Sequence, residues 1–84
     1  MAQFCPIPNQ IVKALVIDPQ PQPRFNRTSL PVANALNHGK PTGFRIFIQR
    51  CTKQLAMGEL VEVQVVRVDR DGHWAFADYL PPQP

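Results

Sequence analysis

Apolar and polar residues alternate along the second half of the chain in a way that indicates half-buried β-strands. In residues 44–49 the apolar residues Phe44, Ile46 and Ile48 recur at every second position. Successive side chains of a strand point to opposite faces, so these three form one buried face. The outward face then carries Arg45, Phe47 and Gln49.

A second alternating run precedes a clear turn signal. Residues 60–68 place valines at positions 61, 63 and 65 and then fall out of phase. A β-bulge near Val66–Arg67 would return Val68 to the core face. The turn Asp69 to Gly72 ends in Asp-Gly, a strong hairpin signal, and predicts a returning strand from His73 to Leu80. On that strand we expect one face with Trp74, Phe76 and Asp78 and the other with Ala75, Ala77 and Tyr79.

The first half gives weaker signals. Ile11 to Ile17 is apolar and β-branched and predicts a strand that Asp18-Pro19 stops. The alternate prolines of residues 19–23 predict an extended connector. Thr28 to Ala33 has strand character, with Pro31 indicating an edge or bulged strand; a helical turn at 32–36 is the alternative. Residues 37–39 predict a turn continuing as a loop through Gly43, and residues 50–57 a connector with room for one helical turn.

Together these segments predict an all-β domain of about five short strands. The most economical fold is a small five-stranded OB-like barrel, with an SH3-like barrel as the alternative, because closing the sheet removes exposed strand edges. We expect an extended arm over residues 1–10, the barrel over residues 11–80 and a proline-rich tail over residues 81–84.

Size and composition argue against an enzyme. A chain of 84 residues has little room for both a scaffold and a deep catalytic pocket. Ser29 lacks a nucleophile motif, and His38 and His73 lie in or beside turns. Cys5 and Cys51 form no metal-binding pattern, and reduced thiols are favoured over a bridge between them. We therefore predict no catalysis, no metal and no cofactor.

The positive charge is concentrated in one part of the chain. The net charge is only +3, but residues 24–53 contain no acidic residue. A basic segment beside exposed aromatics is typical of single-stranded nucleic-acid binding, where cations track phosphates and bases stack on rings. The basic candidates are Arg24, Arg27, Lys40, Arg45, Arg50 and Lys53, and the aromatic ones are Phe47, Trp74 and Phe76.

The stretch from Gly43 to Leu80 resembles a TRAM domain. The shared elements, in order, are Gly43-Phe44-x-Ile46-Phe47-Ile48, Gly58-Glu59, the alternating valines of residues 61–68, and Ala75-Phe76-Ala77-Asp78. TRAM domains are small OB-like barrels, fused to tRNA- and rRNA-modifying methyltransferases and methylthiotransferases or free-standing like cold-shock RNA chaperones. The resemblance implies RNA binding without catalysis, and by matching position it assigns RNA contacts to Phe47 and Phe76.

The chain departs from the TRAM pattern in two places. The glycine-rich turn of that family, Gly-x-Gly-x-Ala, is replaced by a longer proline-rich stretch through residues 29–33, and the connector of residues 49–57 is longer than usual. Arg45, Arg50 and Lys53 are candidates from charge placement alone.

These observations lead to a functional expectation with one alternative. We expect a cytoplasmic module that binds single-stranded or structured RNA, whether tRNA, rRNA or mRNA, with a chaperone-like role as one option. We expect no membrane partner, because no apolar run approaches the roughly 20 residues that span a bilayer. The alternative is a protein-interaction barrel that docks a protein partner through its surface or its proline-rich segments.

Overall fold

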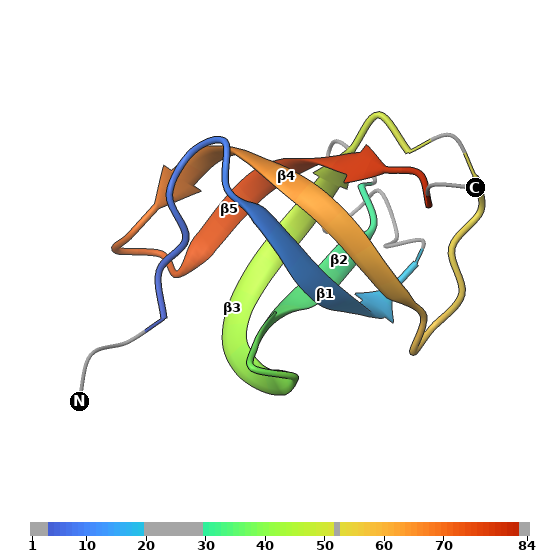
Figure 1. Ribbon diagram of the computed structural model, residues 1–84, viewed down its shortest axis with the longest axis horizontal. Coiled ribbons are helices and arrows are strands. Elements are labelled where there is room, and N and C mark those ends of the chain that lie inside the picture. Colours follow the sequence, from blue (N-terminus) through green and yellow to red (C-terminus); the bar gives the residue numbers. More distant parts are fainter. Residues whose placement is uncertain (1–3, 20–29, 52, 83–84) are drawn as a thin grey trace.

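The computed structural model describes residues 4–19, 30–51 and 53–82, which form five strands and no helix. The strands are β1 (Ile11–Asp18), β2 (Val32–Asn37), β3 (Lys40–Gln49), β4 (Leu60–Asp69) and β5 (Trp74–Leu80) (Figure 1). The predicted fold class, a small all-β barrel of five strands, is confirmed.

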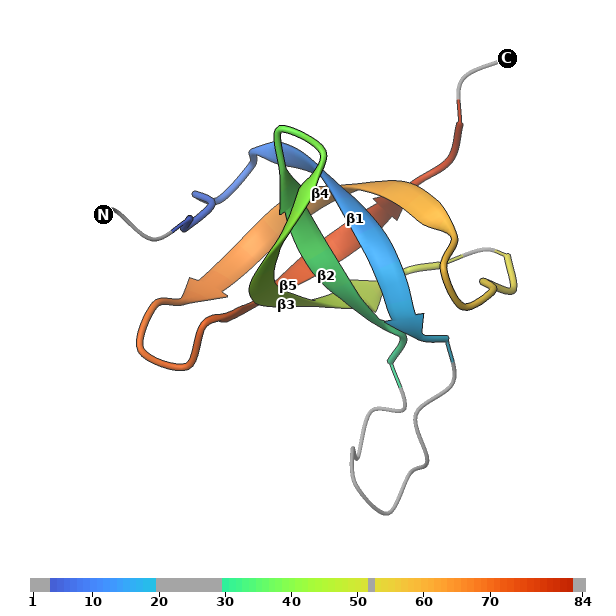
Figure 2. The same cartoon turned by 90° about the horizontal axis from the view of Figure 1, so that it is seen from below.

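The sheet closes on itself in the order β1-β2-β3-β5-β4, with β4 returning to β1 (Figures 1 and 2). Four neighbouring pairs are antiparallel, while β3 and β5 run parallel to each other. The long connection from β3 through β4 makes this parallel pairing geometrically accessible. Closure gives every described strand a neighbour on both sides, so none is left with an unpaired edge.

A bulge bends β3 so that it can pair with both of its neighbouring strands, β2 and β5. The bulge lies between the cross-strand pairs Asn34–Arg45 and Leu36–Pro41. There the single residue Ala35 of β2 is opposite three residues of β3, namely Thr42, Gly43 and Phe44. The side-chain oxygen of Asn34 accepts hydrogen bonds from the backbone N–H of Gly43 at 2.9 Å and of Thr42 at 3.3 Å. Gly43 has φ +80°, a conformation that glycine adopts without steric cost. Figure 1 shows the resulting curvature of β3.

The barrel interior is filled by the inward positions that the alternation predicted. Phe44, Ile46 and Ile48 are buried, as are the valines at positions 61, 63 and 65. The predicted β4 bulge is confirmed, because the β4–β5 register shifts between Val65 and Arg67, and Val68 packs against the core. Residues with no exposed surface include Ala14, Ala33, Ala35, Ala75 and Ala77.

The position of β2 differs from the prediction. Strand character was expected over Thr28 to Ala33, but β2 begins at Val32 and continues to Asn37, while residues 28 and 29 lie outside the described part. Pro31 cannot donate a ladder hydrogen bond, although its carbonyl accepts one from Ile48 N–H at 2.9 Å. The alternative of a helical turn at 32–36 is wrong, because these residues form a strand, and the described residues of the 50–57 connector form no helical turn.

The loop expected from Asn37 through Gly43 is shorter than predicted. Only His38 and Gly39 form the turn, with φ of +54° and +78°, and β3 begins at Lys40. Two consecutive residues with positive φ suit the tight hairpin turn whose twist matches that of the flanking strands. The remaining residues of the expected loop therefore belong to β3.

The amino-terminal segment packs onto the barrel at one end. Phe4 meets Phe44 edge to face, with ring centroids 6.2 Å apart, and Pro6 is buried. The backbone of Asn9 and Gln10 exchanges hydrogen bonds with Val65, which extends the β1–β4 ladder. Cys5 and Cys51 are both free thiols.

Ile46→Ala should destabilise the fold by about 2–5 kcal/mol, because it leaves a cavity at a fully buried core position. Urea denaturation followed by circular dichroism measures this free energy of unfolding. The control is Val66→Ala, at a side chain 49% exposed, where a change within about 0.5 kcal/mol is expected. Equal losses for the two variants would contradict the assigned core.

Candidate functional site

The outer faces of β3 and β5 bring together residues from distant parts of the chain. In the parallel register, Arg45 lies beside Trp74 and Phe47 lies beside Phe76. These outward positions follow from the same alternation that buries Phe44, Ile46 and Ile48, because the side-chain period of a strand is two. The cross-strand pair Phe47–Phe76 therefore lies at the centre of the outer face of β3 and β5.

Phe47, Trp74 and Phe76 form what we call the aromatic cluster. The ring centroids of Trp74 and Phe76 are 5.0 Å apart and those of Phe47 and Trp74 5.9 Å, both with edge-to-face geometry. Phe47 and Phe76 are 5.7 Å apart with a tilt of 43°. Each ring is partly buried by its neighbours and partly open to solvent. Mutual packing holds the rings in place while leaving apolar aromatic surface exposed.

Gly72 determines where the Trp74 ring lies. A Cβ added to Gly72 would stand 2.5 Å from the indole Nε1 of Trp74, so any larger residue would push the ring away. The turn is fixed by Asp69, whose carboxylate accepts a hydrogen bond from Gly72 N–H at 2.9 Å. The sequence indicated Gly72 as a turn residue only, whereas the close approach of the indole becomes visible in the folded chain.

Arginines flank the aromatic cluster on two sides. Arg45 is exposed on β3, with Asn34 of β2 as its other cross-strand neighbour. Arg67 is exposed on β4 and lies opposite Phe76. Within the described ranges, neither guanidinium forms an ion pair. Sequence reasoning missed Arg67, because its proximity to the cluster depends on the register after the β4 bulge.

Arg50 lies just beyond the end of β3, near Asp78 of β5. Its Nε is 3.9 Å from Oδ1 of Asp78, and the Arg50 side chain is 84% exposed. That carboxylate oxygen is itself buried and accepts no hydrogen bond from the described residues. Arg50 thus adds an exposed positive charge beyond the Phe76 end of the cluster, partly offset by a nearby carboxylate.

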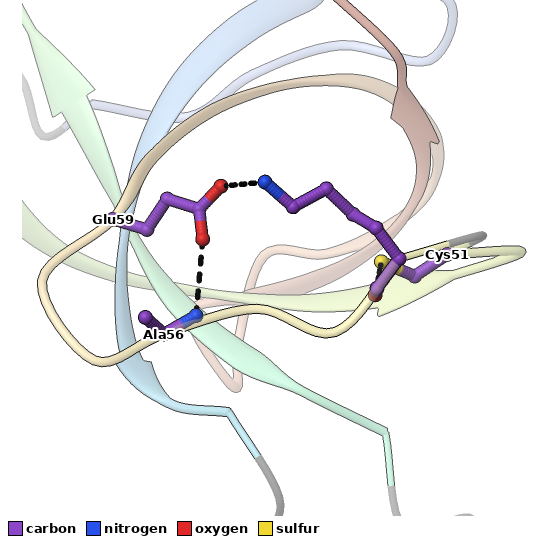
Figure 3. Close-up of polar contacts among 4 residues, drawn as sticks. Cys51, Ala56 and Glu59 are labelled. Atoms are coloured by element: carbon purple, nitrogen blue, oxygen red, sulfur yellow. Dashed lines mark hydrogen bonds and ion pairs between the residues drawn. The ribbon is translucent and has the colours of Figure 1, made fainter.

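Lys53 forms its contacts in the β3–β4 connector and not with the aromatic cluster. It lies in the β3–β4 connector, where its ammonium donates to Oε2 of Glu59, and Ala56 N–H donates to Oε1 of the same carboxylate at 3.0 Å (Figure 3). The hydrogen bond from Lys53, aided by that from Ala56, lowers the pKa of Glu59 below its ordinary value. The hydrogen bond to Glu59 likewise raises the pKa of Lys53. Lys53 therefore supports the connector.

Of the remaining basic candidates, Lys40 lies in the described part of the chain, away from the cluster. Lys40 lies at the β2–β3 hairpin, five residues along β3 from Arg45, a separation of up to about 17 Å on an extended strand. Arg24 and Arg27 lie outside the described residues. Of the sequence candidates, the structure gathers Arg45, Phe47, Trp74 and Phe76, with Arg50 at the edge of the group.

A hollow of about 430 Å³ lies open at the barrel end between Pro31, Ile48, Arg50 and Lys53. Over residues 4–19, 30–51 and 53–82, no cluster of His, Cys, Asp or Glu side chains could hold a metal ion. No helix in that part of the chain is long and apolar enough to cross a membrane.

Comparison with protein-family models, with curated proteins and with solved structures finds no match for this chain. What the barrel binds is therefore inferred from its own surface. The aromatic cluster with its flanking arginines is one feature of that surface with a distinct chemical character.

Gly72→Ala should displace the Trp74 indole and expose it further to water, because the added methyl group would overlap the ring. Trp74 is the only tryptophan, so its fluorescence reports on this site alone. We expect an emission maximum at longer wavelength and stronger acrylamide quenching. Asp71→Ala, in the same turn, is the control, and spectra of Gly72→Ala identical to those of the unaltered protein would contradict the close contact.

Glu59 should titrate below the ordinary range of a glutamate in a carboxyl-carbon NMR experiment, and Lys53→Met should raise its pKa toward that range. Folding lowers this pKa, so the contact stabilises the folded state above the unfolded pKa and is lost as pH falls through the folded value. Folding raises the pKa of Lys53, so its contribution is lost as pH rises through the folded value. Lys13→Met is the control and should leave Glu59 unchanged.

Proposed function

We propose that this barrel is a non-catalytic RNA-binding module that holds single-stranded RNA on the outer face of β3 and β5. The observation that carries the proposal is the aromatic cluster, three partly exposed rings packed together between arginines. Exposed aromatics beside cations are the surface that single-stranded nucleic acids require, since bases stack on rings and phosphates pair with cations.

Stacking would supply most of the affinity. Each base stacked on an aromatic side chain contributes roughly 1–3 kcal/mol. The rings of Phe47, Trp74 and Phe76 are already ordered by edge-to-face contacts with one another. Little side-chain entropy is then lost when a base arrives, and preorganisation of this kind improves affinity without new contacts.

The arginines would hold the sugar–phosphate backbone. Arg45 and Arg67 reach the cluster from opposite sides, through β3 and β4, and both are exposed and unpaired within the described residues. A guanidinium presents a planar set of donors that matches two phosphate oxygens at once. The nearby carboxylate of Asp69 is already engaged by the Gly72 N–H, which reduces its repulsion of phosphate.

The position of the cluster also fits nucleic acid. OB-type barrels bind oligonucleotides on the β2–β3 face and through the β1–β2 and β4–β5 loops. Here Phe47 and Arg45 lie on β3, and Trp74 directly follows the β4–β5 turn. The TRAM-like order of motifs favours RNA over DNA, and a cytoplasmic tRNA, rRNA or mRNA is the partner class that this likeness suggests.

Labelled single-stranded RNA oligomers of mixed sequence should bind with micromolar affinity at low salt, measured by fluorescence anisotropy. Phe47→Leu keeps an apolar side chain but removes the ring, so it should weaken binding by about 5- to 150-fold, the equivalent of one stacked base. A urea titration of the variant checks that the barrel is intact. Absence of binding by the unaltered protein to any oligomer at low salt would refute the proposal.

The salt dependence of RNA affinity tests whether the arginines beside the aromatic cluster, rather than basic residues elsewhere on the surface, contact phosphates. Each phosphate contact to a single strand adds about −0.7 to the slope of log K against log salt. Arg45→Gln should therefore make the slope shallower by about that amount. Lys13→Gln removes the same charge from exposed Lys13 on β1 and should leave the slope unchanged.

A further inference from the structure

The outer face of β1 and β4 carries a second unusual surface, the aliphatic face. Ile11 and Leu60 are each 56% exposed, and Ile17 is 43% exposed. Leu15 and Leu80, half-buried, continue the same surface from β1 and β5. Large aliphatic side chains grouped at outward strand positions mark an interaction surface more often than scattered ones do.

Two opposite charges lie at the centre of the aliphatic face. Lys13 of β1 and Glu62 of β4 are cross-strand neighbours, and both are exposed. No ion pair joins them in the described part of the chain. Each charge is therefore available to a molecule that covers the face.

The ladder between β1 and β4 makes this face complementary to itself. Its register pairs Lys13 with Glu62 and Leu15 with Leu60. A two-fold axis running along the strands between β1 and β4 would place each residue opposite the second copy of its own ladder neighbour. Lys13 would then face the partner's Glu62, and Leu15 would face the partner's Leu60. Figures 1 and 2 show β1 and β4 side by side along this seam.

We propose that the protein forms a two-fold symmetric homodimer through the aliphatic face. The interface has two copies of every contact, as a two-fold interface requires, and packs one barrel sheet on another. The aliphatic side chains exclude water at both ends of the central charges. Lys13 and the partner's Glu62 neutralise each other, as do the partner's Lys13 and Glu62.

The shape of the face allows side chains to interlock. Two shallow hollows lie on either side of Glu62, one of about 200 Å³ lined by Lys13, Leu60 and Leu80, the other of about 290 Å³ lined by Ile11 and Leu80. Both are open to solvent and have aliphatic side chains in their walls, with Glu62 lining each hollow and Glu59 also lining the first. They are suitable recesses for the leucine and isoleucine side chains of a second copy.

A second copy fits the charge pattern better than a uniformly charged partner does. A basic partner would leave Lys13 without a counter-charge, and an acidic partner would do so for Glu62. Covering a charge that has no partner carries a desolvation penalty that nothing offsets. A second copy satisfies both charges at once.

Dimerisation would leave the aromatic cluster open. In the closed order β1-β2-β3-β5-β4, strand β3 is two strands away from the β1–β4 seam in either direction. On β5, Trp74 and Phe76 pair with Asp69 and Arg67, at the opposite end of β4 from Leu60 and Glu62. The aromatic cluster therefore lies on β3 and at the end of β5 that is remote from the aliphatic face. The dimer stands independently of what the aromatic cluster binds.

Analytical ultracentrifugation with charge-reversed variants tests the dimer. The unaltered protein should be dimeric at micromolar concentrations. Lys13→Glu and Glu62→Lys each place like charges across the two-fold axis, so each alone should raise the dimer dissociation constant roughly tenfold or more. An equimolar mixture of the two variants should dimerise again, because every Lys–Glu contact is restored between unlike chains.

The mixing step separates an interface from a folding defect. A variant that only destabilised its own barrel could not be rescued by a second chain. Arg45→Glu changes the net charge by the same amount as Lys13→Glu on the opposite side of the barrel, and it should remain dimeric. An unaltered protein that stays monomeric up to millimolar concentration, or variants that mixing fails to restore, would overturn the proposal.

Discussion

Strand β3 must pair with β2 on one side and β5 on the other, and the bulge held by Asn34 makes this possible. The Asn34 amide oxygen accepts from two consecutive backbone N–H groups of β3, which would otherwise lack a ladder partner. The extra residues turn β3 sharply after its hairpin with β2 and carry it across to β5. Closure of the sheet, burial of the core and assembly of the outer faces all depend on this bend.

Because the barrel is closed, alternate residues of each strand point into the core or out to the surface. The inward residues stabilise the fold, and the outward ones are available for binding. Ile46 and Ile48 fill the interior, while Phe47 between them points outward and contributes to the aromatic cluster. The outer surface then differs from side to side. Rings lie over β3 and β5 with arginines of β3 and β4 beside them, and aliphatic residues around a Lys–Glu pair lie over β1 and the other end of β4. One small fold can present two chemically distinct faces in this way.

The sequence predicted well which residues point into the barrel. It predicted less well which outward residues of different strands lie beside one another. Alternation is a local signal, so residues 44–49, the β4 bulge and the faces of β5 could be derived from it. β2 could not be placed, because Val32, Asn34 and Leu36 lack a clear polar contrast with the inward alanines.

Other features depend on contacts between segments far apart in the chain. Arg67 lies opposite Phe76 only through a shifted register, and Trp74 lies beside Arg45 only through a parallel pairing that no turn signal announces. The partner of Lys53 could not be inferred from a count of charges, since that partner is six residues along the connector.

Five alanines of the described barrel are fully buried, and they limit which substitutions could give the barrel new binding properties. With Ala14, Ala33, Ala35, Ala75 and Ala77 at inward positions, the strand walls approach closely and the larger inward side chains fill what remains. The interior of the described barrel is therefore filled by its own side chains. New binding properties would have to arise by substitution of outward residues, which an interior of this kind leaves free to vary.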